Sequence, residues 1–408
     1  MILDITIKNF RSFLNETTFS MEATSALSKE DNVMTFDNIG RVLKTGVVFG
    51  PNAAGKSNFI TFVYIIRAFI MGANNGGVRR VELYQPFALR EKATEISSSF
   101  AMRFVVHNVI YRYDIEVLGK RILKESLARM YDENKGELLI ERGEEGKDGA
   151  QILYGRSFAP EDQGVSETKI SQSILTPFLY VSIPGLSDVA TYFVQMQFDD
   201  MLYFPSSQLD DRILLLRHWL MMKKQRKEML LQYLRMAGID ITDISFRIEP
   251  MSRKLNVYFS HKMYDENHNL LSTTKKFPYE SESNGTIQLL FYAMRAITAF
   301  ETGSPMLADE FNDGLHTQVS QMLMEMFRSP ETNPNGAQLI ATTHDIYLMD
   351  ENNLRRDQIW FVDKSKEGIS ELYSLVEFQD TTEETPFAKW YLANRFGASL
   401  DTNRKSNE

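Results

Sequence analysis

The segment GPNAAGKS, residues 50–57, constrains the fold of this chain more than any other feature. It matches the pattern G-x-x-x-x-G-K-[ST] in full, it follows the short apolar run 47–49, and a helical pattern begins near Ser57. The glycines let the backbone curl so that successive N–H groups point inward, and the N-terminus of the following helix adds a partial positive charge. The segment therefore predicts a buried strand, an anion-binding loop and a helix, in that order.

Two side chains of this segment have distinct roles in such a loop. Lys56 reaches the β- and γ-phosphates of a nucleotide, and the Ser57 hydroxyl ligates Mg²⁺. The guanine-reading motif [NT]-K-x-D is not found downstream in the sequence, so we expect ATP together with Mg²⁺. The residues expected to contact the nucleotide are Gly50, Asn52, Ala53, Ala54, Gly55, Lys56, Ser57 and Asn58.

Two later apolar runs end in polar residues. Residues 305–308 lead into Asp309 and Glu310, and residues 339–343 lead into His344. Taken alone, acids at a strand end or a single histidine are more often plain structural features. Because the carboxyl ends of parallel strands meet at the mouth of an α/β sheet, we expect these side chains to face the phosphate loop. Asp309 would hold Mg²⁺ through water, Glu310 would be the general base, and His344 would hydrogen-bond the γ-phosphate or the attacking water.

A small polar loop, residues 282–286, precedes a second apolar helix pattern. Its Ser283 and Gly285 suit an anion site at a helix N-terminus, although a plain helix cap has the same composition. One subunit does not need two such sites for one phosphate. Two subunits packed head to tail would use both, each supplying this loop to the other's nucleotide.

Composition and charge narrow the class of protein. Of the 408 residues, 43% are hydrophobic and 24% charged, which is typical of a folded chain, and the length suggests two or three domains or one domain with a large insertion. The absence of cysteine excludes disulfides and thiolate metal sites. The net charge of −9 disfavours a dedicated nucleic-acid binder, and the basic stretch 217–227 is interpreted as the solvated face of a helix, with a nucleic-acid patch as the alternative.

The N-terminus does not have the pattern of a secretion signal. The longest apolar segment, 59–71, contains Arg67 and is too short to span a bilayer. We therefore expect a cytoplasmic protein that makes no membrane contact.

The order of the expected elements indicates an α/β fold. Period-two patterns predict antiparallel strands near residues 2–10, 19–21 and 99–117, and long helical periodicity covers 208–237. In the last third, strands alternate with helices, which favours parallel pairing. We expect residues 1–155 and 240–408 to form one discontinuous head with an antiparallel β lobe, and residues 156–239 to form a mainly helical insertion.

Together these motifs resemble the ABC-type ATPase superfamily, in particular its SMC/RecF/OLD branch. The resemblance rests on IKNFRSF (residues 7–13), GPNAAGKS, the Ser283-x-Gly285-Thr286 signature, LADEFNDGLH (307–316) and ATTHD (341–345). The tail YLANRFGA (391–398) is similar to the ending of stand-alone AAA-type ATPases of bacterial anti-phage defence, the RloA-like proteins and the ATPase subunit of the PARIS system. The motifs cover the first 60 and the last 130 residues well, and the middle of the chain only loosely.

This resemblance implies further roles. Arg11 corresponds to an arginine near the nucleotide, His316 occupies the position of the D-loop aspartate of transporters, and Gln85 is the candidate metal-binding Q-loop glutamine. Ser283 and Gly285 would close on the γ-phosphate bound by a partner subunit. The transporter signature LSGGQ and the long arms of SMC proteins are missing from the sequence, which counts against transport and chromosome tethering.

The resemblance implies a Mg²⁺-dependent ATPase whose ATP-sandwiched homodimer, or higher homo-oligomer, works as a conformational switch. Its output would be anti-phage defence through a separately encoded toxin or nuclease. One alternative is a RecF-like DNA-repair ATPase that binds DNA, and another is a scaffold with a degenerate nucleotide site. The intact Lys56, Asp309, Glu310 and His344 count against the scaffold.

Overall fold

A six-stranded sheet forms the centre of the computed structural model, which describes residues 1–72, 82–132, 135–143, 152–155, 172–198, 209–250 and 253–398. The strand order is β11–β15–β16–β5–β17–β18, and every neighbouring pair is parallel except β17 with β18. Strands β5, β15 and β16 are buried throughout, which explains their largely apolar sequences. The strands are β5 Thr45–Phe49, β11 Gln197–Phe198, β15 Met306–Ala308, β16 Leu339–Thr343, β17 Ile359–Lys364 and β18 Ser370–Ser374.

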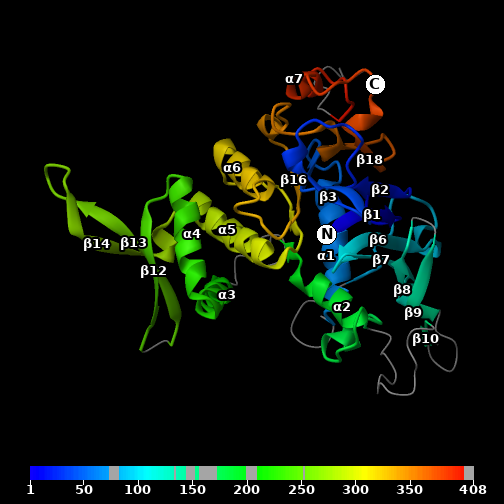
Figure 1. Ribbon diagram of the computed structural model, residues 1–408, viewed down its shortest axis with the longest axis horizontal. Coiled ribbons are helices and arrows are strands. Elements are labelled where there is room, and N and C mark those ends of the chain that lie inside the picture. Colours follow the sequence, from blue (N-terminus) through cyan, green and yellow to red (C-terminus); the bar gives the residue numbers. More distant parts are fainter. Residues whose placement is uncertain are drawn as a thin grey trace.

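A seven-stranded antiparallel sheet forms a second layer, in the order β10–β9–β8–β7–β6–β1–β2 (Figure 1). The antiparallel strands expected within 99–117 are confirmed as β6 and β7. Their two-residue turn consists of His107 and Asn108, both with positive φ (48° and 62°), as a type I′ hairpin turn requires. The strands are β1 Ile2–Lys8, β2 Thr17–Ser20, β6 Ser98–Val106, β7 Val109–Leu118, β8 Arg121–Met130, β9 Gly136–Gly143 and β10 Ile152–Tyr154, with a separate hairpin of β3 Val33–Phe36 and β4 Gly40–Leu43.

Helix α1, Lys56–Ile70, fills the space between the two sheets. Its Phe62 ring stacks on Phe10 at 4.1 Å between centroids and meets Phe100 edge-on at 5.4 Å, so one helix residue joins it to the antiparallel lobe. Helix α2, Leu186–Gln195, packs beside α1 and β6. The α/β fold class with an antiparallel β lobe is thereby confirmed.

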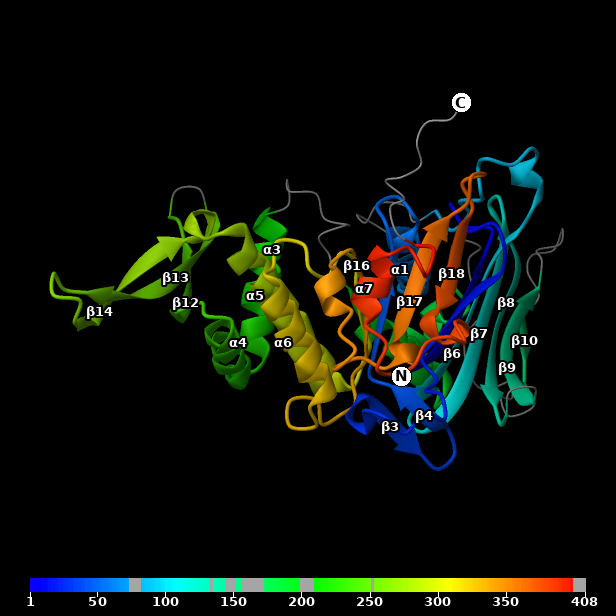
Figure 2. The ribbon, with the colours of Figure 1, turned by 90° about the horizontal axis from the view of Figure 1, so that it is seen from above.

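The other face of the parallel sheet is covered by a second set of elements. Val47 and Phe49 of β5 belong to this second core, whereas Val48 between them faces the first, as the alternation of a strand dictates. The sheet β12–β14 projects from this side, away from the head (Figures 1 and 2). The elements are α3 Leu209–Met222, α4 Lys224–Met236, β12 Ile241–Ile248, β13 Leu255–Tyr264, β14 Leu270–Pro278, α5 Asn284–Thr302, α6 Thr317–Arg328 and α7 Phe387–Leu392.

The periodic stretch 208–237 is two helices rather than one. Lys223 has an extended backbone (φ −145°, ψ 122°) and separates α3 from α4. This turn lets Lys223 and Arg226 both reach Glu301 of α5, at 3.0 and 2.6 Å. Lys227 pairs with Asp243, so three of the five lysines and arginines in the basic stretch 217–227 are held in ion pairs rather than left for a nucleic acid.

The expected insertion, 156–239, stays a prediction as a domain boundary. The described part of it divides between the two cores. The α2 segment packs on α1 and β6, whereas α3 and α4 pack with α5, β12 and β13. In the described part of the chain, none of the helices combines the length and the apolar character needed to cross a bilayer.

Candidate functional site

Three loops meet at the carboxyl edge of the parallel sheet. Strand β16 pairs with β15 on one side and β5 on the other, so the residues that follow these strands become neighbours. They surround a pocket of about 290 Å³. The lining residues are Asn52, Ala53, Gly55, Lys56, Ser57, Asn58, Glu310 and His344. The sequence predicted every one of them as a site residue.

Glycine is required at both fixed positions of the phosphate loop. Gly55 has φ +125°, and a Cβ there would lie 2.4 Å from the Ser370 Oγ and 2.9 Å from the Ser12 Oγ. A Cβ on Gly50 would lie 2.3 Å from the carbonyl oxygen of Val362, on the neighbouring strand β17. The loop therefore packs closely against β17, β18 and the turn between β1 and β2, and this packing fixes its curvature.

The Lys56 side chain is hydrogen-bonded to the backbone of the phosphate loop. Its side chain is 5% exposed, and its Nζ donates to the carbonyl oxygens of Gly50 and Pro51 at 2.8 and 3.0 Å. Burial lowers the pKa of Lys56 from its ordinary value of 10.5, and the nearby carboxylates of Glu310 and Asp309 oppose that effect. A phosphate entering the pocket would offer this ammonium group a stronger partner than two backbone carbonyls.

The N-terminus of α1 has no side-chain cap. Its N-cap residue is Gly55, and Ser57 lies half-buried in the first turn, at the pocket wall. The first N–H groups of a helix need acceptors from outside it, and phosphate oxygens supply them in sites of this kind. This end of α1 is therefore arranged for an anion.

Arg11 and Gln85 lie behind the loop rather than in the pocket lining. Arg11 Nε donates to Gln85 Oε1 at 2.8 Å, and Arg11 Nη1 donates to Asn58 Oδ1 at 3.2 Å. Asn58 in turn donates to the Ser12 Oγ at 2.8 Å. Arg11 braces the start of α1 through Asn58, and Gln85 holds Arg11 in turn. The roles predicted for them, nucleotide contact for Arg11 and metal binding for Gln85, stay predictions.

The acidic pair differs sharply in environment. Asp309 is 3% exposed; its Oδ1 accepts from the Thr342 hydroxyl, while its buried Oδ2 has no hydrogen-bond partner. Glu310 is exposed, lines the pocket and has a left-handed backbone with φ +48°. A buried carboxylate oxygen left unpaired near a phosphate loop fits a hard cation such as Mg²⁺, for which oxygen is the preferred ligand.

His344 lies exposed at the end of β16. Its Nε2 is 3.5 Å from the Asn312 Nδ2, and the Asn312 Oδ1 accepts from the hydroxyl of Thr343. The next residue, Asp345, accepts from the Thr317 hydroxyl at 2.6 Å and so holds the start of α6. Asn312 and Thr342 were not singled out by sequence reasoning. The available signal was that Asn312 lies two residues after Glu310 and Thr342 lies two residues before His344.

Ser283 and Gly285 do not line this pocket. Ser283 caps α5, its hydroxyl accepting from the Thr286 N–H at 3.1 Å. A Cβ on Gly285 would lie 2.7 Å from the carbonyl oxygen of Gly314, so the start of α5 packs on the loop that follows the acidic pair. His316, at the end of that loop, caps α6 by accepting from the Gln318 N–H at 3.3 Å.

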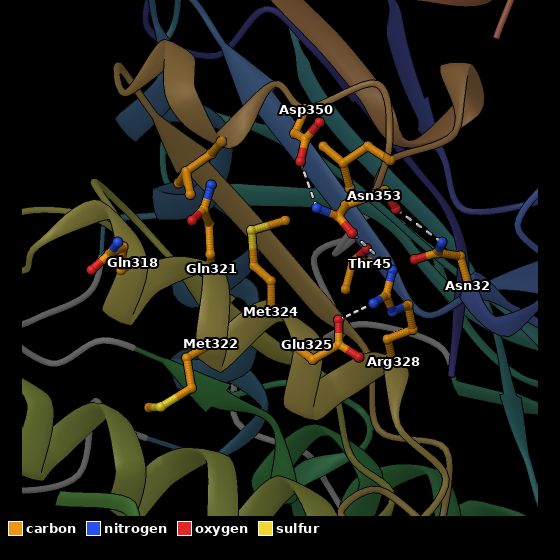
Figure 3. A pocket seen from close by; sticks show the side chains of 12 residues that line it. Asn32, Thr45, Gln318, Gln321, Met322, Met324, Glu325, Arg328, Asp350 and Asn353 are labelled. Carbon is orange, nitrogen blue, oxygen red and sulfur yellow. Dashed lines mark hydrogen bonds and ion pairs between the residues drawn. The ribbon is translucent and has the colours of Figure 1, made fainter. Parts of the chain in front are cut away.

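A second pocket, of about 270 Å³, lies along α6 (Figure 3). Met322 and Met324 form part of its wall, and Arg328 bridges Glu325 and Asn353 across it. Asn353 also donates to Asp350. The pocket shares no lining residue with the phosphate-loop pocket.

Comparison with protein families gives one match. Residues 207–350 match the family model described as "AAA domain, putative AbiEii toxin, Type IV TA system". The matched region covers about a third of the chain and contains Ser283, Asp309, Glu310 and His344, but it excludes the phosphate loop. No curated protein sequence matches the chain.

Among solved structures, the chain is similar to heads of the SMC and RecF type. An SMC head bound to the C-winged helix domain of ScpA is 13% identical, with a TM-score of 0.43, over 91% of this chain and 97% of that one. RecF with ATP, a recombination mediator of the RecFOR pathway, is 13% identical, with a TM-score of 0.33 over the same shares. An SMC head with an extended coiled coil, bound to the C-terminal domain of ScpA from Pyrococcus furiosus, is 12% identical, with a TM-score of 0.38, over 91% of this chain and 96% of that one.

Proposed function

We propose that this chain is a Mg²⁺-dependent ATPase whose nucleotide site is completed by a second copy. The observation that carries the proposal is the pocket that the phosphate loop, Glu310 and His344 line together, with the unpaired oxygen of Asp309 buried near it. The Lys56 ammonium group for the phosphates, an unpaired carboxylate oxygen for Mg²⁺ and the Glu310 carboxylate for the attacking water are groups that phosphoryl transfer to water can use.

Each residue then has a defined task. Lys56 leaves the carbonyl oxygens of Gly50 and Pro51 and binds the phosphates, and the first N–H groups of α1 donate hydrogen bonds to the phosphate oxygens. Glu310 takes the proton of the attacking water, and His344 hydrogen-bonds the γ-phosphate or that water. Ser57 and Asp309 would hold Mg²⁺, which neutralises charge on the phosphates.

The partner subunit enters through the start of α5. Ser283 and Gly285 lie outside the pocket formed by their own chain's phosphate loop, so a nucleotide would meet them only from another copy. Closing two copies head to tail would place the cap of one on the γ-phosphate held by the other. ATP would then work as a switch between open and closed dimers.

The biological output that we propose is regulation of a separately encoded toxic effector in anti-phage defence. The family model that matches residues 207–350 carries a description naming a toxin–antitoxin system, which supports this assignment. A RecF-like role in DNA repair is disfavoured, because Lys223, Arg226 and Lys227 of the basic stretch are engaged in ion pairs.

Glu310→Gln tests the hydrolytic part of the proposal. The variant retains the shape of the side chain but cannot accept a proton, so turnover should fall by roughly 10²- to 10⁴-fold while ATP binding persists. Size-exclusion chromatography with ATP and Mg²⁺ should show a stable dimer for the variant and a transient one for the wild type. A variant that hydrolyses ATP at the wild-type rate would remove Glu310 from the role of base.

A further inference from the structure

One buried hydroxyl contacts both members of the acidic pair. The Thr342 Oγ1 donates its hydrogen to the Asp309 Oδ1 and accepts the backbone N–H of Glu310 at 2.9 Å. The Thr342 carbonyl also accepts the Phe311 N–H at 2.9 Å. Three consecutive residues of the acidic loop are therefore held by a single residue of β16.

The register of the sheet explains this contact. Ala308 lies opposite Ala341, so the next pair along the two parallel strands is Asp309 and Thr342. On its other side, Thr342 lies opposite Val48 of β5, two residues before the phosphate loop begins at Gly50. Thr342 is 0% exposed and stands between the strand of the acids and the strand of the loop.

The hydroxyl has one hydrogen, and this fixes its direction. Because the carboxylate of Asp309 can only accept, the hydrogen points to Asp309, and a lone pair is left for the Glu310 N–H. The bond occupies the Oδ1 of Asp309 and leaves the Oδ2 as the oxygen without a partner. The second bond holds Glu310 in its left-handed conformation, which L side chains rarely adopt.

We propose that Thr342 is the positioning residue of this site, which orients the metal-binding oxygen of Asp309 and holds the backbone of the base Glu310. The inference rests on the proposed ATPase function and extends it to a residue that does not line the phosphate-loop pocket. A plain structural role, in which a β-branched residue merely fills a buried strand position, predicts that valine can replace it. A positioning role predicts that the hydroxyl is required.

Four variants separate these roles. Thr342→Val removes the hydroxyl at nearly constant volume, Thr342→Ser retains it, and Thr342→Ala removes both the hydroxyl and the methyl group. Thr45→Val is the matched control. Thr45 is also buried (2% exposed), and its hydroxyl accepts a hydrogen bond from the Gln358 side chain, but it lies at the end of β5 remote from the phosphate loop.

The measured quantity is the affinity for Mn²⁺ in the presence of a non-hydrolysable ATP analogue, monitored by electron paramagnetic resonance. Outer residues that orient a metal ligand typically contribute about 10- to 100-fold in metal affinity or activity, so Thr342→Val should weaken Mn²⁺ binding by about that factor and lower kcat similarly. Binding of the analogue in EDTA should be unchanged, because Lys56 and the loop are intact. Thr342→Ser should recover most of the Mn²⁺ affinity, and Thr45→Val should retain it.

The outcomes separate cleanly. Wild-type Mn²⁺ affinity in Thr342→Val overturns the inference alone, and so does an equal loss of Mn²⁺ affinity in Thr342→Val and Thr45→Val. If Thr342→Val does not fold, weak Mn²⁺ binding by Thr342→Ala beside strong binding by Thr342→Ser supports the inference, and equal binding overturns it. A wild-type protein that binds neither the analogue nor Mn²⁺ overturns both the inference and the proposed ATPase function.

Discussion

Two helices of this protein begin with similar small polar sequences, yet their N-termini are built differently. Helix α1 starts after Gly55, has no side-chain cap and lies at a pocket that Lys56 helps to line. Helix α5 starts after Ser283, whose hydroxyl already accepts the N–H of Thr286. Each helix leaves N–H groups that need acceptors, but only α5 supplies one from its own sequence.

The difference indicates what each end can do alone. The start of α1 has no side-chain cap, holds a buried ammonium group bonded only to backbone carbonyls and has, nearby, a carboxylate oxygen without a partner, so an anion and a cation could both bind there. At the start of α5 the Ser283 hydroxyl already accepts one of these N–H groups, and Gly285 packs on Gly314. We therefore expect nucleotide affinity to depend on α1, and subunit closure to depend on α5.

The largest effect should come from Lys56→Ala. Hydrogen bonds to charged groups contribute about 1.5–3 kcal/mol each, so losing this ammonium group should weaken ATP binding by about 10- to 100-fold. Isothermal titration calorimetry measures this directly. Lys364→Ala is the matched control, because the exposed Lys364 donates to the Ala53 carbonyl at 2.9 Å from outside the loop. Equal affinities for the two variants would contradict the assignment of the loop.

A pair of glycine substitutions sharpens the contrast. Gly55→Ala adds a Cβ that collides with Ser370 and Ser12 at a positive φ, so it should cost about 1–3 kcal/mol in folding free energy and weaken ATP binding. Gly285→Ala meets only the Gly314 carbonyl, and alanine is the better helix former by about 1 kcal/mol, which offsets part of the strain. Its ATP affinity should stay at the wild-type value in the monomer. Thermal melting with and without ATP measures the stability and the ATP binding of each variant. An equal loss of ATP binding in the two variants would show that the N-termini of α1 and α5 act together.

The sequence allowed much of the site to be predicted, because the site lies where buried strands end. A parallel strand covered on both faces has an apolar sequence, so the polar residues that follow it stand out, as Asp309, Glu310 and His344 do. The phosphate loop was predictable because its spacing follows from the chemistry it performs. The antiparallel lobe was predictable from its period-two patterns, which β6 and β7 confirm.

The contacts between distant elements could not be predicted. Nothing local marks Thr342 as different from Thr343, because their partners depend on the register of β16 against β15. The break at Lys223 depends on Glu301, which is 78 residues away in the chain. Gly285 is required by Gly314, a packing partner in another loop. Each of these features is decided by tertiary packing, which overrides the helical or strand pattern of the segment itself.

A smaller effect should come from Ser283→Ala. Removing a serine cap typically costs about 1 kcal/mol, so the midpoint of chemical denaturation should fall modestly. ATP affinity of the single subunit should not change, because Ser283 lies outside the pocket lining. Placed in the Glu310→Gln background, Ser283→Ala should also reduce the ATP-dependent dimer seen by size exclusion. An undiminished dimer would show that the cap loop does not reach the partner's nucleotide.

The smallest expected effect is the uptake of a proton by the protein when ATP binds at alkaline pH. In the empty protein, burial lowers the pKa of Lys56 below 10.5, and bound phosphates should raise it again because negative charge favours the ammonium form. Between the two pKa values, the bound state holds more protons than the free state, so affinity falls as pH rises through that window and is constant below it. Calorimetry in two buffers of different ionisation enthalpy measures the uptake. Ser283→Ala should retain it, since α5 contributes no such group, whereas Lys56→Ala should abolish it. Uptake that persisted without Lys56 would mean that another group near the phosphates titrates, and the contrast between the two helix ends would then not depend on this lysine.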